Sequence, residues 1–281
     1  MAEQKVYKPR PITGFPEWLP EVRRVEQQWM DHIRKVFESY GFCSIETPSV
    51  EEIDVLSAKG EVDKEIYVIE RLHKDDNEKS DARLALHFDQ TVPLARYVAQ
   101  HFNDLTFPFK RYQMQKVWRG ERPQAGRFRE FYQCDIDVIG VDSVPIHFDG
   151  ELAAIMVDIL RGLNIGPFQM QISNRKILMG LCEGLGIVDT LPVTRAIDKI
   201  EKIGKDGTRK LLIEAGLAAQ QIETLITFAA IKTEDSSFVE QVLALGVSNP
   251  TLAEGVAELD SVMAQLTHIE RGFIIADLSI V

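Results

Sequence analysis

The chain has few of the residues that would indicate a metal site or a disulfide framework. Its three cysteines, Cys43, Cys134 and Cys182, lie far apart and form no CxxC pair, so neither a zinc site nor a set of disulfides is indicated. We expect three buried, apolar cysteines in a reducing cytosol, which predicts a cytoplasmic protein. The six histidines, including His87, His101 and His147, show no metal-ligand spacing, and we expect no metal site.

Long apolar runs and nucleotide-binding loop motifs are also missing. No run approaches the ~18 apolar residues of a membrane span, so we expect no membrane partner. The opening residues, MAEQKVYKPRP, lack the apolar core of a signal peptide. Neither GxGxxG nor GxxxxGK[ST] occurs, which argues against Rossmann and P-loop phosphate binding. The net charge of -11 in 281 residues argues against a surface that binds nucleic acid throughout.

The spacing of apolar residues predicts a mixture of helices and strands. Helical spacing occurs at 20–40, from Thr91 onward and at 149–163. Strand patterns occur at 42–53, 66–72, 83–88, 107–118, 131–140, 168–174 and 272–281. Pro48 marks the first of these as an edge or interface strand. Elements interleaved in this order predict an α+β fold with antiparallel strands, and not repeated βαβ units.

The character of the chain changes at about residue 175. From 175 to 268 short helical patterns dominate, strand patterns vanish, and the only aromatic residues are Phe228 and Phe238. We interpret this segment as a helical insertion domain. The preceding residues, 1–174, would form a core, and 269–281 would be a strand that returns to it. Because that core strand stands at the chain end, we expect a C-terminally truncated polypeptide.

The most informative segment runs from Arg119 to Asp137, RGERPQAGRFREFYQCDID. The flanking strand patterns predict a hairpin whose turn carries four arginines with glutamates between them. Guanidinium groups match phosphate oxygens in bidentate fashion, and the glutamates would repel an extended phosphate backbone. We therefore expect a small polyanion, favouring a nucleoside triphosphate. The alternative is a solvated loop held by internal salt bridges, which is what clustered charges usually form.

Two further groups of polar residues could bind a ligand. Asp89, in the FDQT sequence at 88–91, lies between a strand pattern and a helix start. This position favours a helix-capping or turn aspartate, and the alternative is an anion that binds an ammonium group. Gln133, Asp135 and Asp137 alternate along the returning strand and so share one face. If that face lines a cleft, it forms a polar pocket for a small cationic or hydrogen-bonding ligand; if it faces solvent, it carries no function.

These residues resemble histidyl-tRNA synthetases, a class II aminoacyl-tRNA synthetase family, over nearly all of residues 10–281. RGERPQAGRFREFYQ resembles motif 2 of the family, and GFCSIETPSVE resembles motif 1, whose proline would be Pro48. LHFDQTVPLARY and SNRKIL are similar to other segments of the family, and IADLSIV resembles the strand that precedes its RGLDYYTG signature. The resemblance implies a class II antiparallel sheet flanked by helices, with a helical insertion domain.

The resemblance also implies an ATP site in the arginine hairpin. Arg119 would bind the α-phosphate of ATP and stabilise the charge of the transition state, which makes it the catalytic residue. Glu121 would accept a hydrogen bond from the adenine amine. Arg127 would bind the terminal phosphates, and Phe131 would stack on adenine. Mg²⁺ would arrive with ATP.

A histidine site is implied next to it. Asp89 and Thr91 would bind the α-ammonium group of histidine, with Gln133 nearby. Asp137 would recognise the imidazole ring. His87 departs from the family pattern, because related sequences usually carry arginine at that position.

The resemblance implies an ATP-dependent histidine–tRNA ligase, an enzyme of protein biosynthesis. It would activate L-histidine as histidyl-adenylate and transfer it to tRNA(His), as a cytoplasmic homodimer that pairs through motif 1 around Pro48. The chain ends before the RGLDYYTG signature, a motif 3 arginine and an anticodon-binding domain. We therefore expect these residues alone to be inactive.

Two other functions compete with this interpretation. A regulatory paralogue that senses histidine and partners ATP phosphoribosyltransferase would share the fold and lack the anticodon-binding domain. The set Arg119, Glu121 and Arg127 argues against it, because a sensor has no need to bind ATP. A non-catalytic nucleic-acid-binding module is disfavoured by the net charge of -11 and by the glutamates in the hairpin.

Overall fold

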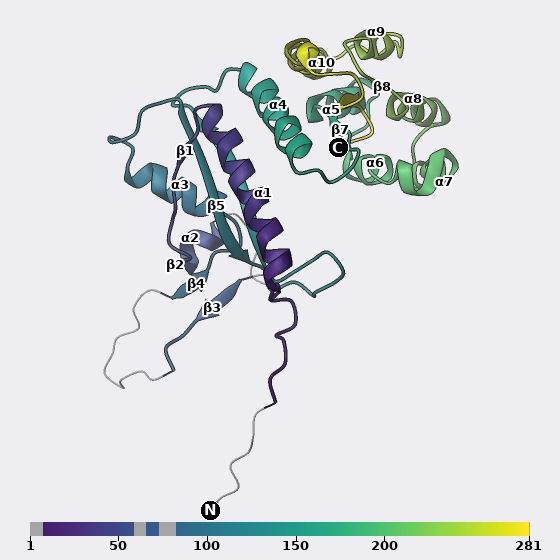
Figure 1. Cartoon of the computed structure of the whole chain (residues 1–281). Helices are drawn as coiled ribbons and strands as arrows, with labels where there is room; N and C mark the ends of the chain where they lie inside the picture. The colour runs from purple at the N-terminus through teal and green to yellow at the C-terminus, as the bar shows by residue number, and fades with distance from the viewer. Residues whose placement is uncertain (1–7, 59–65, 73–82, 281) are drawn as a thin grey trace, which may run out of the picture. The chain divides into compact units, whose positions relative to one another are not determined.

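The computed structural model of the chain describes residues 8–58, 66–72 and 83–280, and these form two compact units that divide between Val144 and Pro145 (Figure 1). Both units combine helices with small sheets, as an α+β fold requires. In the described part of the chain, no helix has both the length and the apolar character needed to span a membrane.

The first unit is built on a long β-hairpin. Its strands are β5 (Phe109–Trp118) and β6 (Glu130–Ile139), which pair antiparallel along their whole length. β1 (Cys43–Ser44) joins the free side of β5 in parallel orientation. α1 (Pro20–Ser39) lies alongside β5 (Figure 1) and contacts it through Phe37, whose ring centre is 5.6 Å from that of Tyr112. The hairpin predicted at 107–118 and 131–140 is thus present within two residues of its expected bounds.

A second, smaller sheet in this unit supports the start of α3. Its strands are antiparallel in the order β2 (Val50–Glu52), β4 (Leu84–Leu86) and β3 (Tyr67–Ile69). The helices beside it are α2 (Ile53–Ser57) and α3 (Thr91–Gln100). Leu56, Ala85 and Phe88 form a small apolar cluster there. This cluster holds the segment between β4 and α3, which contains Asp89, in a buried position.

The single strand expected at 42–53 is wrong in one respect. The chain forms β1 and β2 in two different sheets, and Pro48 lies in neither. Proline has no N–H to donate to a ladder, so it suits the crossing between sheets. The residues beside it bind β5 instead: Gln115 Nε2 donates to the carbonyl oxygen of Thr47 at 3.0 Å and to Ser49 Oγ at 3.1 Å. Both strands do lie at sheet edges, as predicted.

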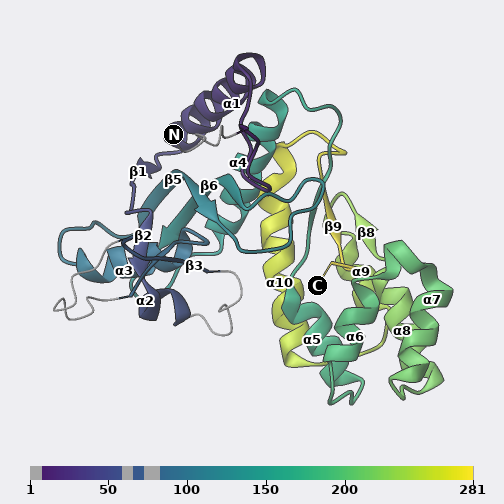
Figure 2. The same cartoon turned by 90° about the horizontal axis from the view of Figure 1, so that it is seen from below.

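The second unit is mainly helical (Figure 2). Its helices are α4 (His147–Gly162), α5 (Arg175–Gly184), α6 (Leu191–Ile197), α7 (Ile200–Glu214), α8 (Ala219–Ala229), α9 (Phe238–Leu243), α10 (Pro250–Gln265) and the 3₁₀ turn η1 (Leu266–His268). The strands are β7 (Met170–Ile172), β9 (Ile274–Asp277) and β8 (Lys232–Thr233), in that spatial order. The unit has one continuous apolar core that includes the fully buried Ile177, Leu212 and Phe238.

Two glycines let α5 and α10 approach closely. A Cβ atom at Gly180 would lie 2.1 Å from the backbone nitrogen of Leu252, and one at Gly255 would lie 2.8 Å from that of Ile177. Since such distances are far below van der Waals contact, a side chain at either position would push the helices apart. The pair thereby seals one side of the apolar core.

The regular elements in segment 175–268 are helices except for β8, which corrects the expectation that this segment contains no strand. β8 is two residues long and pairs with β9, so its formation depends on a partner distant in sequence. The compact units place α4 and β7 with the helices that follow them. The division into a core at 1–174, an insertion domain at 175–268 and a returning strand at 269–281 stays a prediction.

Candidate functional site

The arginine loop between β5 and β6 is closed at its base by the backbone. Arg119 N–H donates to the carbonyl oxygen of Arg129 at 2.9 Å. At the tip, Gln124 and Arg127 form a bridge around Gly126, whose φ of 78° lies in the left-handed region that favours glycine. The loop therefore has a defined conformation, and its arginines are presented from fixed backbone positions.

The N-terminal arm also holds this loop. The carbonyl oxygen of Gly14 accepts hydrogen bonds from the N–H groups of Arg129, at 2.7 Å, and Glu130, at 3.2 Å. A Cβ atom at Gly14 would lie 2.9 Å from the Arg129 side chain, so glycine permits this close approach. Sequence patterns do not predict this contact.

The loop encloses a pocket of about 250 Å³, lined by Arg119, Glu121, Gly126, Arg127, Phe128 and Phe131. The guanidinium carbon of Arg119 lies 5.1 Å from the centre of the Phe131 ring, and its Nε donates to the carbonyl oxygen of Phe88 at 3.1 Å. The structure thus brings the four residues selected for ATP binding, Arg119, Glu121, Arg127 and Phe131, into one pocket. Together these four residues provide two guanidinium groups, one carboxylate and one aromatic ring.

An internal salt bridge is present in this pocket, as the competing interpretation expected. Arg127 Nη1 donates to Glu121 Oε2 at 3.1 Å. The Arg127 side chain is 67% exposed, so the pair contributes at most ~1 kcal/mol. A pair this weak would yield readily to the phosphate groups of a ligand, because a multiply charged anion attracts the guanidinium more strongly.

The face of the hairpin that continues from this pocket is polar. On β5, Arg111, Gln113 and Gln115 are buried, and they stand directly opposite Asp137, Asp135 and Gln133 of β6. The side chains on β6 are half-buried, so the predicted common face of Gln133, Asp135 and Asp137 is not a solvated surface. Burying polar groups is unfavourable unless they are hydrogen-bonded. A polar sheet face of this length is therefore more typical of a binding site than of a core.

A network of amides holds the face in place. Gln113 Nε2 donates to Thr47 Oγ1 at 3.0 Å and to Gln115 Oε1 at 2.6 Å. Gln90 Nε2 donates to the carbonyl oxygens of Gln115 on β5, at 3.0 Å, and of Gln133 on β6, at 3.2 Å. The sequence interpretation missed Gln90, Gln113 and Gln115. The signal was available for two of them, since RYQMQ in β5 has the same alternation that identified the face of β6.

The charges of this face act on one another. Arg111 is fully buried, and its Nη2 contacts Oδ2 of Asp137. Burial lowers the pKa of Arg111, while Asp137 and Asp135 act in the opposite direction. Burial raises the pKa of Asp135; Arg111 and Arg119 oppose this rise, and Asp137 and Asp89 add to it. Arg119 and Asp89 therefore lie within the electrostatic reach of the polar face, which links that face to the arginine pocket.

Asp89 caps α3, as the more conservative interpretation predicted. Its Oδ1 accepts a hydrogen bond from the N–H of Val92 at 3.2 Å, and the residue is buried. Thr91, the first residue of α3, is exposed. A capping role for one carboxylate oxygen does not conflict with ligand binding by the other, because a carboxylate has acceptor sites on both oxygens.

Burial disfavours the charged forms of His87, Cys134 and Cys182. Burial lowers the pKa of His87, whose Nε2 is 2.8 Å from the carbonyl oxygen of Lys116. Burial raises the pKa of both Cys134 and Cys182 to about 11. The expectation that all three cysteines are buried is correct only for Cys182, because Cys134 is half-buried and Cys43, in an edge strand, is exposed. Among the described residues, no group of three or more His, Cys, Asp or Glu side chains is arranged to hold a metal ion.

Comparison with known proteins decides the family. A family model described as histidyl-tRNA synthetase matches residues 14–281. The chain belongs to the histidyl-tRNA synthetase family. A histidine–tRNA ligase from Thermobifida fusca (strain YX) is 57% identical over 281 residues, which are 100% of this chain and 64% of that protein. The chain spans between 61% and 64% of the length of the curated relatives it matches first.

Solved structures confirm the fold class. The crystal structure of histidyl-tRNA synthetase from Nostoc sp. PCC 7120 matches with a TM-score of 0.84 and 38% identity, over 98% of this chain and 62% of that one. A structure described as an ATP phosphoribosyltransferase regulatory subunit/histidyl-tRNA synthetase from Bacillus halodurans C matches with a TM-score of 0.79 at 20% identity, over 99% of this chain and 70% of that one. The second likeness concerns the fold alone. The predicted α+β, class II synthetase-like fold is therefore confirmed, although β1–β5 and β7–β9 are parallel pairs.

Proposed function

We propose that the natural protein containing this chain is a histidine–tRNA ligase, which activates L-histidine with ATP and transfers it to tRNA(His) in the cytoplasm. The observation that carries the proposal is the continuity of one strand. β6 leaves the arginine pocket at Phe131 and presents Gln133 and Asp137 on its polar face two and six residues later. A polyanion and a small polar ligand bound at these places would lie next to each other.

In this proposal the arginine pocket binds ATP. Arg119 contacts the α-phosphate, Arg127 the terminal phosphates, and Glu121 accepts from the adenine amine. Adenine stacks on Phe131, whose ring centre lies 5.1 Å from the guanidinium carbon of Arg119. Mg²⁺ enters with ATP as part of the substrate and neutralises phosphate charge.

The polar face of the hairpin binds histidine. Asp89 and Thr91 bind the α-ammonium group, Gln133 lies beside it, and Asp137 accepts a hydrogen bond from the imidazole ring. The placement of Asp89 within the electrostatic reach of Asp135 supports a common site. The exposed position of Thr91 at the start of α3 leaves its hydroxyl accessible to a ligand.

The first reaction needs no nucleophile from the protein. A carboxylate oxygen of histidine attacks the α-phosphorus of ATP, a new P–O bond forms, and the bond to the β-phosphate oxygen breaks to release pyrophosphate. Catalysis then rests on holding the two substrates together and on stabilising the charge that develops on the α-phosphate. Arg119 is placed for the second task, because its Nε–H bond to Phe88 fixes the guanidinium at the floor of the pocket.

We further propose a homodimer that pairs through the region of Pro48 and α1. Several apolar side chains of α1 are exposed, among them Val22 (50%), Val25 (43%) and Trp29 (40%). A helix with such a stripe is suited to a two-fold interface. Residues 175–268 would act as an insertion domain that closes over the acceptor end of tRNA.

The test is the exchange of pyrophosphate into ATP by the natural protein, measured with each amino acid in turn. A histidine–tRNA ligase gives exchange with histidine and none above background with the other amino acids. Tight histidine binding without exchange would contradict the proposal and would favour a histidine-sensing regulatory protein. Steeply salt-dependent binding to arbitrary RNA, unaffected by ATP, would favour a nucleic-acid-binding module.

A further inference from the structure

Arg111 on β5 is a charged residue to which the proposed site gives no role. It is the largest fully buried side chain in the described part of the chain. Its Nη2 contacts Asp137, yet no nitrogen of its guanidinium has an aligned hydrogen-bond partner among the described residues. The contact is therefore a pairing of charges and not a bidentate hydrogen bond. A buried guanidinium with free N–H groups is unfavourable for folding alone, which indicates a functional reason for it.

The strand register decides what Arg111 acts on. Arg111 and Asp137 are direct partners across the antiparallel hairpin, and Asp135 is two residues along β6 on the same face. Burial lowers the pKa of Arg111. The negative charges of Asp137 and Asp135 raise this pKa, and Asp137 has the larger effect. Burial raises the pKa of Asp135. Among the charged groups that lower this pKa, Arg111 has the largest effect. One guanidinium thus balances two carboxylates.

We propose that Arg111 is a positioning residue of the histidine site, which fixes the orientation of Asp137. This inference rests on the proposed function, in which Asp137 recognises the imidazole ring. Arg111 would not touch the substrate. It would act through Asp137, much as a carboxylate behind a histidine orients that ring in other enzymes. An arginine suits this role because it stays protonated even when buried.

Among the described residues, three further charged groups belong to the surroundings of this pair. Asp135 is on the same strand, Asp89 precedes α3, and Arg119 follows β5; these are the groups that act on Asp135 together with Arg111 and Asp137. The neighbouring thiol of Cys134 is neutral, because burial raises its pKa to about 11. Without the charge of Arg111, three carboxylates would face the single cation Arg119. The pKa of Asp135, which burial already raises and Arg111 lowers, would then rise further, and Asp135 would take up a proton as the pH falls.

The test compares Arg111→Met with Arg111→Lys in the natural protein, by the KM for histidine and kcat in pyrophosphate exchange from pH 6 to 8.5. For Arg111→Met, we expect the KM ratio to wild type to grow as the pH falls, because Asp135 then takes up a proton; an increase of about tenfold corresponds to about 1.4 kcal/mol. Dividing by the wild-type KM at the same pH removes the effect of protonation of the histidine substrate. We expect kcat to change less than KM. Arg111→Lys keeps the charge and should recover most of the wild-type pH profile.

Three outcomes would overturn the inference: a KM ratio for Arg111→Met that is independent of pH, no recovery in Arg111→Lys, or a loss confined to kcat. If Arg111→Met does not fold, the double variant Arg111→Met/Asp137→Asn removes both charges. It should fold and have the same KM for histidine as Asp137→Asn alone, and a wild-type KM would contradict the inference. Arg209→Met, which breaks an arginine–carboxylate pair in the second unit, is the control and should leave the profile unchanged. Absence of histidine-dependent exchange in the wild-type protein would overturn the proposed function as well.

Discussion

The two units of the chain bury different kinds of side chain. In the described part of the first unit, the buried residues include polar ones on β5 and around it: Thr47, Glu51, His87, Asp89, Gln90, Arg111, Gln113 and Gln115. In the described part of the second unit, one continuous apolar core joins every long helix, and fewer polar side chains are buried: Thr208, Thr233, Asp277 and Ser279. Apolar burial stabilises a fold by ~25 cal/mol per Å², whereas polar burial is neutral at best. The second unit is thus organised for stability, and the first holds polar groups that stability alone does not require.

This difference indicates where to look for function. A buried polar group is maintained by hydrogen bonds: Gln113 and Gln115 connect β5 to Thr47, and Gln90 donates to both strands of the hairpin. The polar face is therefore rigid before any ligand binds, which is the condition for positioning two substrates. Substitutions of buried residues in the second unit should therefore lower stability. Substitutions on the polar face of the first unit should lower substrate turnover.

The largest expected effect is on stability in the second unit. Phe228 is 1% exposed in the apolar core, so Phe228→Ala should lower the free energy of unfolding by about 3–5 kcal/mol. Chemical denaturation followed by circular dichroism measures this change. Leu243→Ala, at a site that is 70% exposed on α9, is the matched control and should stay within about 0.5 kcal/mol of wild type. Equal losses for the two variants would contradict the description of the core.

Next in size is the effect of Arg119→Ala on the first reaction. Removing one preorganised cation from the α-phosphate should slow histidyl-adenylate formation by about 100- to 1000-fold, or about 3–4 kcal/mol, with little change in stability. Single-turnover measurement in the natural protein gives this rate. Arg122→Ala removes an exposed arginine of the same loop that does not line the pocket, and it should have a small effect. A rate for Arg119→Ala within threefold of wild type would refute the assigned role.

A smaller change is expected for Gln113→Leu, which sharpens the contrast between stability and function. Gln113 Oε1 is buried without a hydrogen-bond partner among the described residues, so leucine removes an unsatisfied acceptor together with the amide bonds to Thr47 and Gln115. The free energy of unfolding should therefore change by less than about 1.5 kcal/mol. The KM for histidine should rise several-fold, because Asp135 directly opposite loses a polar neighbour. A large loss of stability with an unchanged KM would show that the polar face is structural.

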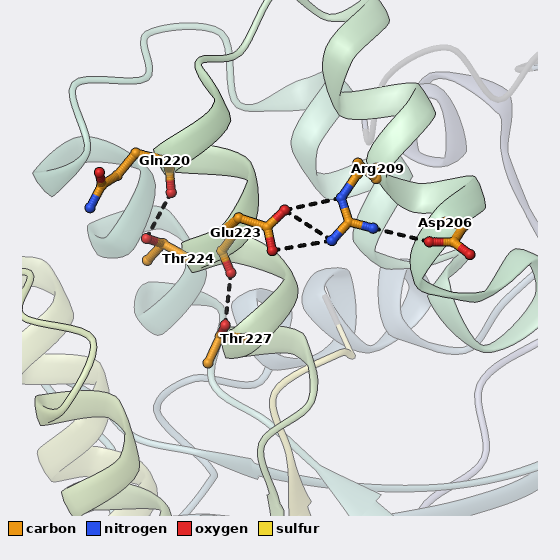
Figure 3. A network of polar contacts seen from close by, with 6 residues as sticks. All are labelled: Asp206, Arg209, Gln220, Glu223, Thr224 and Thr227. Carbon is orange, nitrogen blue, oxygen red and sulfur yellow. Dashed lines mark hydrogen bonds and ion pairs between the residues drawn. The ribbon is translucent and has the colours of Figure 1, made fainter.

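The smallest effect concerns the surface of the second unit. Arg209 binds both carboxylate oxygens of Glu223, at 3.0 and 3.1 Å, and Asp206 at 3.0 Å (Figure 3). These groups are exposed, so Arg209→Ala should lower the free energy of unfolding by at most ~1 kcal/mol. The difference should shrink in high salt, because screening weakens exposed charge pairs. If the difference does not depend on salt, the packing of the aliphatic stem of Arg209 contributes more to the free energy of unfolding than its charge does.

The sequence predicted the hairpin well because its signal is local. Alternation of apolar and polar residues continues through both strands, and the turn between them is marked by charge. The same local rule failed at Pro48, where the strand pattern runs on while the chain passes from one sheet to another. It also failed at β8, whose two residues are a strand only through pairing with β9.

The residues of the candidate site also differ in whether local sequence patterns predict them. Arg119, Glu121, Arg127 and Phe131 lie close together in the sequence, and the structure places them in one pocket. Arg111 was missed because its significance comes from strand register, which sets it opposite Asp137. Sequence patterns also favour apolar residues for buried positions, so a buried polar face escapes them until burial is known.

In the proposed function, one β-hairpin brings both substrates together. The most direct test is a crystal structure of the natural protein with a non-reactive analogue of histidyl-adenylate. We predict the phosphate analogue at Arg119, the adenine on Phe131 and the imidazole within hydrogen-bond distance of Asp137. An analogue bound away from the polar face of β5 and β6, or with its imidazole remote from Asp137, would contradict the account.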